Sequence, residues 1–221
     1  IVTIVQAFGT QKMARENAII KNLKAVESLG CVSVICSDKT GTLTQNKMTV
    51  QEVFADGEVL DGLALDFDNT VHRYLLYDAV LNNDSDIVDG KGIGDPTEYA
   101  LLEMFRKLHS EPNSAFGQNG IHEDMIRQSV TRMEEIPFDS DRKLMSTKYC
   151  LHGVPTILTK GAVDVLLDRC VGVLYSDGVR RMSEEERTRI QEQNRRFSEK
   201  GLRVLAFAYR ESDEPLNRNA E

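Results

Sequence analysis

Residues 130–160 read VTRMEEIPFDSDRKLMSTKYCLHGVPTILTK, and this stretch decides the fold. Strand-like segments at about 130–136, 144–150 and 155–159 are separated by short runs of Asp, Ser and Gly, which are typical of turns. Strands that follow one another so closely pair in antiparallel fashion, because parallel neighbours need a long crossover between them. The stretch therefore predicts an antiparallel sheet.

The sequence after this stretch continues the pattern. We expect a helix over about 161–170, then a hairpin over 171–182 with its turn at Asp177-Gly178. Ser183, with Glu186 three residues on, forms a capping box that begins another helix, and Gly201 ends it. A final strand is expected over 202–209.

The sequence before it supplies helices. Helical patterns cover about 71–83 and 95–109, and a polar stretch over 110–120 reads as an exposed loop. A strand over 48–55 closes at the Asp56-Gly57 turn. Strands in sequence with a few helices indicate the α+β class, an antiparallel sheet flanked by helices.

The first fifty or so residues have a different character. A helix is expected over 11–29, and the apolar run CVSVICS at 31–37 reads as a buried strand that ends at a polar loop. This order is typical of a piece of an α/β domain. We therefore divide the chain into residues 1–52 and residues 53–221.

Composition excludes several classes of protein. The 221 residues are 41% hydrophobic and 28% charged with a net charge of −8, which argues against a nucleic-acid partner. No apolar run is long enough to span a bilayer. The four cysteines form no CxxC pair, so we expect buried or half-buried thiols in a reducing compartment.

Asp38 stands at the end of the expected strand 31–37, where open α/β sheets place their chemistry. An aspartate there can accept a phosphoryl group as a nucleophile. Thr40 and Thr42 offer hydroxyls around it, and Gly41 allows close approach of the backbone. The same residues also suit a solvated turn, and their chemistry alone does not decide between the two interpretations.

A resemblance to a known family decides between these two interpretations. CSDKTGTLT at 36–44 resembles the phosphorylation motif of the P-type cation-transporting ATPases. Four later blocks resemble the nucleotide-binding domain of the same family in order, and the residues before Asp38 are most similar to its calcium-transporting, type II branch. The blocks are GDPTEYAL (94–101), PFDSDRKLMS (137–146), TKGAVDVLLDRC (159–170) and GLRVLAFA (201–208).

The resemblance implies roles for individual residues. Asp38 is implied as the residue that ATP phosphorylates, with Mg²⁺ held at Asp38 and Thr40. Residues 1–52 are implied as part of a Rossmann-like phosphorylation domain and 53–221 as the nucleotide-binding domain. In that domain Phe138 is implied to stack on adenine, and the other implied pocket residues are Glu98, Lys143, Lys160, Gly161, Arg203 and Leu205.

Plainer interpretations stand beside three of these roles. Phe138 follows a proline at a strand end and would equally serve in the core. Glu98 follows Asp95 and Pro96 at the start of a helix, where it would act as a capping-box partner. Arg203 falls in an alternating strand and would point to solvent.

One position departs from the family. The calcium pumps of animal reticulum carry an arginine two residues after the stacking Phe, and this chain has Ser140 there, with Arg142 two residues later.

The function implied is that of an ATP-binding segment on the cytoplasmic side of a membrane cation pump. Its partners are ATP or ADP and the remaining domains of the same pump, with Ile1–Val5 approaching from a membrane helix and the final strand and hinge falling beyond Glu221. We expect a monomer that binds nucleotide weakly without ion-dependent turnover.

Two alternatives remain open. A soluble phosphohydrolase of the haloacid-dehalogenase type shares the aspartyl nucleophile, but it typically has a second carboxylate where this chain has Thr40. A non-catalytic nucleotide-binding module is the other.

Overall fold

The structure is a computed structural model that describes residues 2–22, 26, 28–88, 90–110 and 123–217. It divides into two compact units, Ile1–Asn46 and Lys47–Glu221, and each is described by itself. The assignment of residues 1–52 and 53–221 to two named domains stays a prediction.

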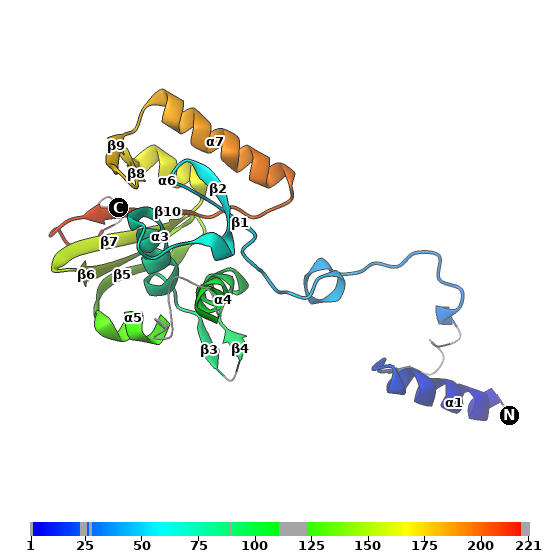
Figure 1. The fold of residues 1–221 in the computed structure, drawn as a ribbon. Helices are drawn as coiled ribbons and strands as arrows, with labels where there is room; N and C mark the ends of the chain where they lie inside the picture. The colour runs from blue at the N-terminus through cyan, green and yellow to red at the C-terminus, as the bar shows by residue number, and fades with distance from the viewer. Residues whose placement is uncertain (1, 23–25, 27, 89, 111–122, 218–221) are drawn as a thin grey trace. The chain divides into compact units, whose positions relative to one another are not determined.

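The second unit is built on a four-stranded antiparallel sheet in the order β10-β7-β6-β5 (Figure 1). Its strands are β5 (Arg132–Asp139), β6 (Leu144–Leu151), β7 (Val154–Gly161) and β10 (Ala206–Glu211). The consecutive antiparallel strands predicted from residues 130–160 are confirmed. The last strand begins four residues later than expected, because 202–205 form an irregular approach to it.

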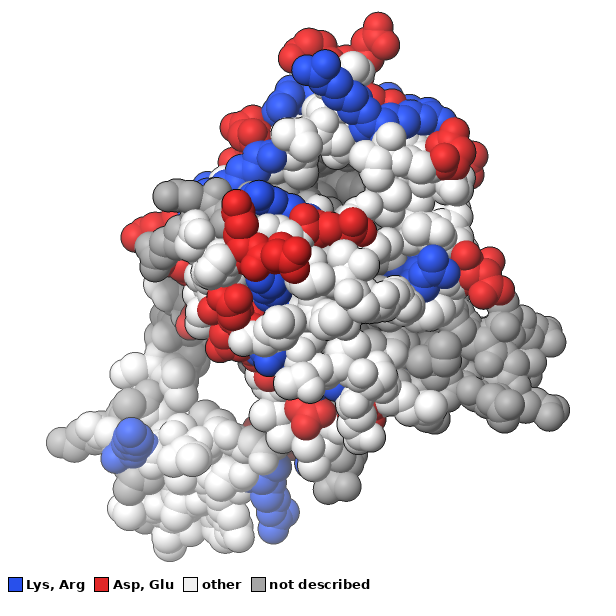
Figure 2. Space-filling model, turned by 90° about the vertical axis from the view of Figure 1, so that its left-hand side faces the viewer, with Lys and Arg blue, Asp and Glu red and all other residues white. Residues whose placement is uncertain are grey.

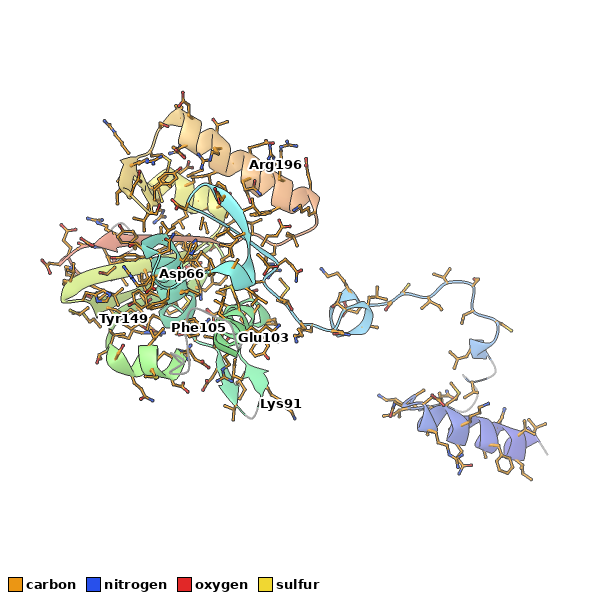
Figure 3. All side chains as sticks on the ribbon, viewed as in Figure 1. Asp66, Lys91, Glu103, Phe105, Tyr149 and Arg196 are labelled. Carbon is orange, nitrogen blue, oxygen red and sulfur yellow. The ribbon has the colours of Figure 1, made fainter. Side chains whose placement is uncertain are left out.

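Three helices pack on one face of this sheet and close the core. They are α3 (Thr70–Leu81), α4 (Pro96–Ser110) and α5 (Glu123–Ser129). α3 begins at Asn69, whose side chain accepts hydrogen bonds from the first turn. The core joins apolar side chains of these helices to β6 and β7, with Phe105 and Tyr149 near its centre (Figure 3). The expected helices 71–83 and 95–109 are confirmed, and most of the expected loop 110–120 lies outside the described residues.

The remaining described elements of this unit are one short helix, one long helix, one 3₁₀ turn and three hairpins. α6 (Val163–Arg169) packs against β7 and β10, and α7 (Glu184–Glu199) packs against α6. Ser183 caps α7 by accepting from the Glu186 N–H, as the capping box predicts. The hairpins and the 3₁₀ turn are β1 (Glu52–Ala55) with β2 (Glu58–Asp61), η2 (Gly62–Ala64), β3 (Asp86–Val88) with β4 (Lys91–Ile93), and β8 (Gly172–Tyr175) with β9 (Gly178–Arg181).

In the part that the structure describes, the first unit contains the helix α1 (Val2–Arg15) and a π-helical turn, η1 (Lys39–Leu43), and residues 26 and 28–29 are also helical. The helix expected over 11–29 is wrong in its bounds. α1 ends where Asn17 takes a left-handed conformation (φ 61°) and the Ala18 N–H donates to the Met13 carbonyl. Among the described residues, no helix has both the length and the apolar character that crossing a membrane requires.

The buried strand expected over 31–37 is wrong. These residues are exposed and form no regular structure, because no strand among the described residues pairs with them to satisfy their backbone groups. Cys31, Cys36 and Cys150 are exposed and Cys170 is half-buried, so the expectation of buried or half-buried thiols is wrong for the first three.

The strand β5 lies at one edge of the sheet and is irregular. Its pairing with β6 shifts register between Arg132 and Glu134 and again between Ile136 and Asp139. Pro137 falls in the second shift, where its missing N–H costs no ladder hydrogen bond. The end of β5 is therefore free of strict ladder geometry, which matters for the site below.

Replacement of Phe105 tests how much the apolar core contributes to stability. Its side chain is fully buried (0% exposed), so Phe105→Ala is expected to lower the free energy of unfolding by about 3–5 kcal/mol through lost burial and a residual cavity. Urea denaturation followed by circular dichroism measures this loss. Val171→Ala is the control: Val171 is 86% exposed, and its replacement should change stability by less than about 0.5 kcal/mol. Equal losses in the two variants would contradict the described core.

Candidate functional site

One end of the sheet gathers the residues that the sequence singles out. A single rung crosses all four strands there, pairing Asp139 with Leu144, Leu144 with Gly161, and Gly161 with Ala206. The predicted site residues in the strands and turns are at this rung or within a few positions of it: Phe138, Lys143, Lys160, Gly161, Arg203 and Leu205. The topology thus brings together residues up to 67 positions apart (Phe138 to Leu205, 205 − 138 = 67).

Phe138 projects an aromatic ring into solvent from the end of β5. Its side chain is 63% exposed, so its interpretation as a core residue is wrong. Covering such a ring with a ligand or partner removes its apolar surface from water, which is favourable. Phe138 is therefore positioned to stack on a flat apolar group.

Lys143 is exposed in the turn between β5 and β6. Its backbone is left-handed (φ 59°), and its N–H donates to the Asp139 carbonyl at 2.6 Å. Its own carbonyl accepts from the Ala162 N–H at 3.1 Å, which joins the turn to the end of β7. The turn is therefore fixed at both ends while the Lys143 side chain stays free to meet an anion.

Close packing of the protein itself requires a glycine at position 161. A Cβ at this position would lie 2.2 Å from the Lys143 carbonyl oxygen and 2.6 Å from Leu144 Cδ2. The space a side chain would need is occupied by the start of β6. Gly161 therefore lets two backbones of the protein approach each other, whatever access it also gives to a ligand.

Lys160 and Glu98 form the charged centre of the site. The Lys160 side chain is 6% exposed, and its Nζ lies 2.6 Å from Glu98 Oε1. The same Nζ donates to the Asn82 carbonyl. Glu98 Oε2 accepts from the Asp84 N–H at 3.1 Å and the Ser85 hydroxyl at 3.4 Å. A buried ion pair is retained only when each charge has such further partners.

These contacts change the interpretation of Glu98. The start of α4 is capped by Asp95, whose Oδ1 accepts from the Thr97 N–H at 2.8 Å. The Glu98 carboxylate instead contacts Lys160 and the turn after α3. The proposed capping-box role for Glu98 is therefore not what its carboxylate does in this structure.

Arg203 lies just before β10, in an irregular segment, so the expectation that it belongs to an alternating strand is wrong. Its side chain is exposed, and Nη1 donates to the Thr97 hydroxyl at 3.1 Å. Thr97 is the neighbour of Glu98, so this contact brings a second cation to the same helix start. Leu205 is half-buried beside it.

Arg142 does not project from the turn as a free cation. Its Nη2 donates to the carbonyls of Ile136, Pro137 and Leu144, at 3.2, 3.1 and 2.7 Å, and the side chain is buried. These bonds brace the turn that carries Phe138 and Lys143. Arg142 therefore supports this turn and does not act as the exposed arginine that the family carries at position 140.

Asp38 is exposed at the start of η1, and its Oδ1 accepts from the Lys39 N–H at 2.8 Å. Thr40 lies within η1, and its side chain is outside the described part of the chain. Mg²⁺ prefers several oxygen ligands in octahedral geometry. The described residues contain no cluster of three acidic, His or Cys side chains that could hold a metal, so Asp38 supplies a single carboxylate.

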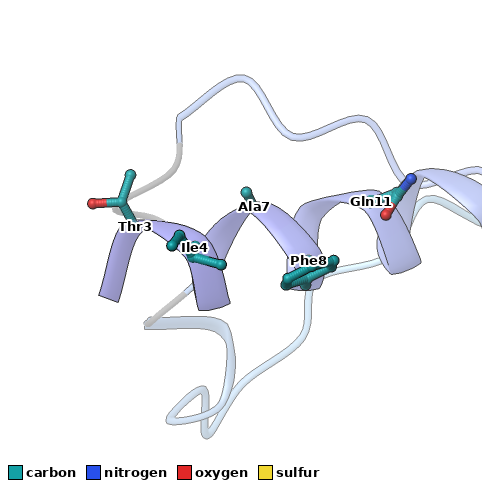
Figure 4. A pocket seen from close by; sticks show the side chains of 5 residues that line it. All are labelled: Thr3, Ile4, Ala7, Phe8 and Gln11. Atoms are coloured by element: carbon teal, nitrogen blue, oxygen red, sulfur yellow. The ribbon is translucent and has the colours of Figure 1, made fainter. Parts of the chain in front are cut away.

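Two other surfaces are poorer candidates. A cavity of about 530 Å³ on α1 is lined by uncharged side chains of that one helix, among them Ile4 and Phe8 (Figure 4). On the face drawn in Figure 2, Lys and Arg lie beside Asp and Glu. On α7, for example, Arg195 and Arg196 pair with Glu192. The cavity on α1 has no charged side chain in its lining, and these charges on α7 are paired with one another.

Three residues that the sequence does not single out also belong to the site: Asn82, Asn83 and Ser85. Asn83 Nδ2 donates to the Glu98 main-chain carbonyl at 2.9 Å, and Ser85 contacts the Glu98 carboxylate. A run of Asn, Asp and Ser after a helix signals a turn. It does not say which distant residue the turn holds, so this role emerges only from the fold.

Comparison with known proteins decides the family. A family model described as P-type ATPase, cytoplasmic domain N, matches residues 72–221. The chain belongs to the P-type ATPases. The antiparallel sheet with flanking helices is consistent with the nucleotide-binding domain of this family, and the resemblance stated above is confirmed.

The curated relatives include many calcium pumps. The chain is 45% identical to a calcium-transporting ATPase of Listeria monocytogenes, over 95% of this chain and 23% of the relative. It is 44% identical to calcium-transporting ATPase 1 of Lactococcus lactis, with the same coverage, and 32% identical to the human calcium-transporting ATPase type 2C member 1, over 94% and 24%. The chain thus spans about a quarter of the length of these relatives.

Asp78 is a buried carboxylic acid beneath the site, and its titration makes the stability of the fold depend on pH. Burial raises the pKa of its carboxyl from 3.8 to about 7, while the hydrogen bond from Asn82 and the charge of Lys160 lower it. Between these two pH values the unfolded chain loses this proton and the folded chain keeps it. Above about pH 7 the group therefore costs the fold on the order of 4 kcal/mol.

Asp78→Asn removes this cost and keeps the acceptor for Asn82. The stability of the variant relative to the wild type is therefore expected to increase from about pH 4 to about pH 7 and then level off. Urea denaturation of both proteins across this range measures the difference. A difference that stays constant with pH would show that folding does not raise the pKa of Asp78.

Proposed function

We propose that residues 53–221 bind the adenine nucleotide of an ATP-driven cation pump at the end of the sheet formed by β5, β6, β7 and β10. The observation that carries the proposal is the convergence at one rung of an exposed aromatic ring and several cations. This combination suits a ligand with one flat apolar end and one anionic end. ATP, the substrate implied by the family, has both.

Different residues are proposed to contact the adenine end and the phosphate end of the nucleotide. Phe138 offers its face to the adenine ring, and Leu205 provides apolar wall. Lys143 and Arg203 are exposed cations within reach of a phosphate chain, while Lys160 is held by Glu98 and Asn82. In this arrangement the buried Lys160–Glu98 pair orients the base end, and the exposed cations receive the phosphates.

Asp38 is proposed as the phosphoryl acceptor in the whole pump. A carboxylate oxygen of Asp38 bonds to the γ-phosphorus as the bond to the β–γ bridging oxygen breaks, and ADP leaves with that electron pair. Asp38 and Thr40 are the residues of this chain proposed to contact Mg²⁺, which supplies charge neutralisation of the phosphates when bound. The single described carboxylate fits one ligand position only, so further ligands must come from elsewhere in the pump.

The transported ion is proposed to be Ca²⁺. The support is that relatives of 42–45% identity over about 95% of the chain are named calcium-transporting ATPases. On this proposal the rest of the pump supplies membrane helices and the remaining cytoplasmic domains, and this segment lies on the cytoplasmic side of the cell membrane, as a monomer.

A non-catalytic nucleotide-binding module is the second candidate for the 221-residue chain by itself. The observation that favours it is the exposure of residues 31–39, which leaves Asp38 without a packed surround. A free-standing haloacid-dehalogenase-type phosphohydrolase is disfavoured, because Thr40 replaces the second carboxylate that such enzymes typically use and the family match covers 72–221.

Phe138→Ala tests the proposed stack. Loss of base stacking costs about 1–3 kcal/mol, so the Kd for ADP is expected to rise roughly tenfold or more. Titration followed by amide NMR shifts measures the Kd. Met133→Ala is the matched control, since Met133 is an exposed side chain on the same strand, away from the rung. Unchanged affinity in Phe138→Ala would rule out the stack.

The isolated chain is expected to bind ATP without steady turnover. One carboxylate cannot both accept the phosphoryl group and complete the coordination of the Mg²⁺ that neutralises it, so phosphate release from ATP should equal that of Asp38→Asn. A phosphate-release assay with and without Ca²⁺ measures it. Turnover that depends on Asp38 would instead show that the 221 residues contain a complete catalytic site.

A further inference from the structure

Helix α3 ends directly beneath the Lys160–Glu98 pair. Asn82 is its C-cap residue (φ −87°, ψ 60°), and the Asn82 N–H still donates to the Asp78 carbonyl. The backbone leaves the helix at Asn82, so its own carbonyl is turned away from the helix axis and accepts from Lys160 Nζ. The end of a helix carries partial negative charge, which favours an ammonium at this point.

The side chain of Asn82 fixes where that carbonyl lies. Asn82 is fully buried, and its Nδ2 lies within hydrogen-bond distance of Asp78 Oδ1 (2.9 Å), the Met145 carbonyl (3.1 Å) and the Leu158 carbonyl (3.3 Å). One side-chain amide therefore ties the end of α3 to β6 and β7. Lys160 follows Leu158 on the same strand by two residues, so both lie on the same face of the sheet.

The residues after Asn82 hold the other member of the pair. The Asn83 side-chain amide donates a hydrogen bond to the Glu98 main-chain carbonyl. The Asp84 N–H and the Ser85 hydroxyl donate to the Glu98 carboxylate. Two arginines and a tyrosine fix this turn and the last turn of α3 by donating to their carbonyls. The clamping side chains are Arg127, Arg132 and Tyr149, with acceptors at Val80, Leu81, Asn83 and Ser85.

We propose that Asn82 is a positioning residue for the nucleotide site, which holds the Lys160 ammonium between α3 and α4 so that it stays paired with Glu98. The proposal rests on the proposed nucleotide binding and adds a residue that touches no ligand. Lys160 Nζ meets only Asn82 and Glu98 among the hydrogen-bond partners described. A shift of the Asn82 carbonyl therefore leaves a buried ammonium with a single partner, and Lys160 must move or take up water.

The alternative is that Asn82 only stabilises the fold. A purely structural residue would lower stability when replaced, yet leave the Lys160 ammonium and the nucleotide affinity of the folded protein unchanged. The two roles separate in a measurement made on the Lys160 nitrogen itself, because a buried, hydrogen-bonded ammonium exchanges its protons slowly with water and gives a resolved signal.

The experiment compares wild type, Asn82→Ala and Thr147→Val, each as the 221-residue chain labelled with ¹⁵N at the lysine Nζ. Thr147 is the matched control: it is fully buried, it pairs with Leu158 across β6 and β7, and its hydroxyl has no partner among the described residues. Amide spectra check that each variant is folded. ADP titration then gives the Kd of each.

In Asn82→Ala we expect the Lys160 ammonium signal to be lost or shifted and the Kd for ADP to rise about tenfold, the equivalent of one lost charged hydrogen bond. In Thr147→Val both should match wild type. An unchanged Lys160 signal in folded Asn82→Ala would overturn the proposal, as would an equal loss in Thr147→Val.

A second measurement needs no variant. The hydrogen bond from Lys160 Nζ to the Asn82 carbonyl predicts a scalar coupling between the Lys160 ¹⁵Nζ and the Asn82 carbonyl carbon in the wild-type chain. Absence of that coupling with a resolved Lys160 signal overturns the proposal even if Asn82→Ala does not fold. Failure of the wild type to bind ADP would instead overturn the proposed function, while the coupling still decides whether Asn82 holds Lys160.

Discussion

The burial of one positive charge constrains much of the second unit. Lys160 sits on a central strand with its ammonium out of water, and a charge in that position is tolerated only with a close counter-charge and a further acceptor. Glu98 supplies the first from α4, and the Asn82 carbonyl supplies the second from the end of α3. The end of α3 and the first turn of α4 must therefore both lie beside Lys160, and the apolar side chains around Phe105 form the core next to them.

The fold of the second unit could largely be predicted because its signals are local. The turn residues between the strands of 130–160 and the Ser183 cap each act within a few residues of themselves. Even so, Arg203 was expected in a strand that begins only at Ala206, since apolar alternation continues through the irregular approach to β10. The resemblance identified the site residues, and strand pairing explains why Phe138, Lys143 and Gly161 meet, although they are separated in sequence.

What could not be predicted depends on partners distant in the sequence. The apolar run at 31–37 has the composition of a buried strand, but a strand forms only where neighbours take its hydrogen bonds, and none of the described residues does so. Nothing in the sequence of Asn82 shows that its side chain reaches the Met145 and Leu158 carbonyls on two different strands. Likewise, Glu98 has a complete local explanation as a cap, and only the packing of α3 against α4 reveals its pairing with Lys160 instead.

The irregular strand β5 has a consequence for solubility. An exposed aromatic ring at the end of a flat edge strand would invite a second copy of the chain to add its own strand there. The two register shifts in β5 and the missing N–H of Pro137 break the row of hydrogen-bonding groups that such an addition needs. The same irregularity that lets Phe138 stand clear of the sheet thus discourages self-association at the surface where the ring is exposed.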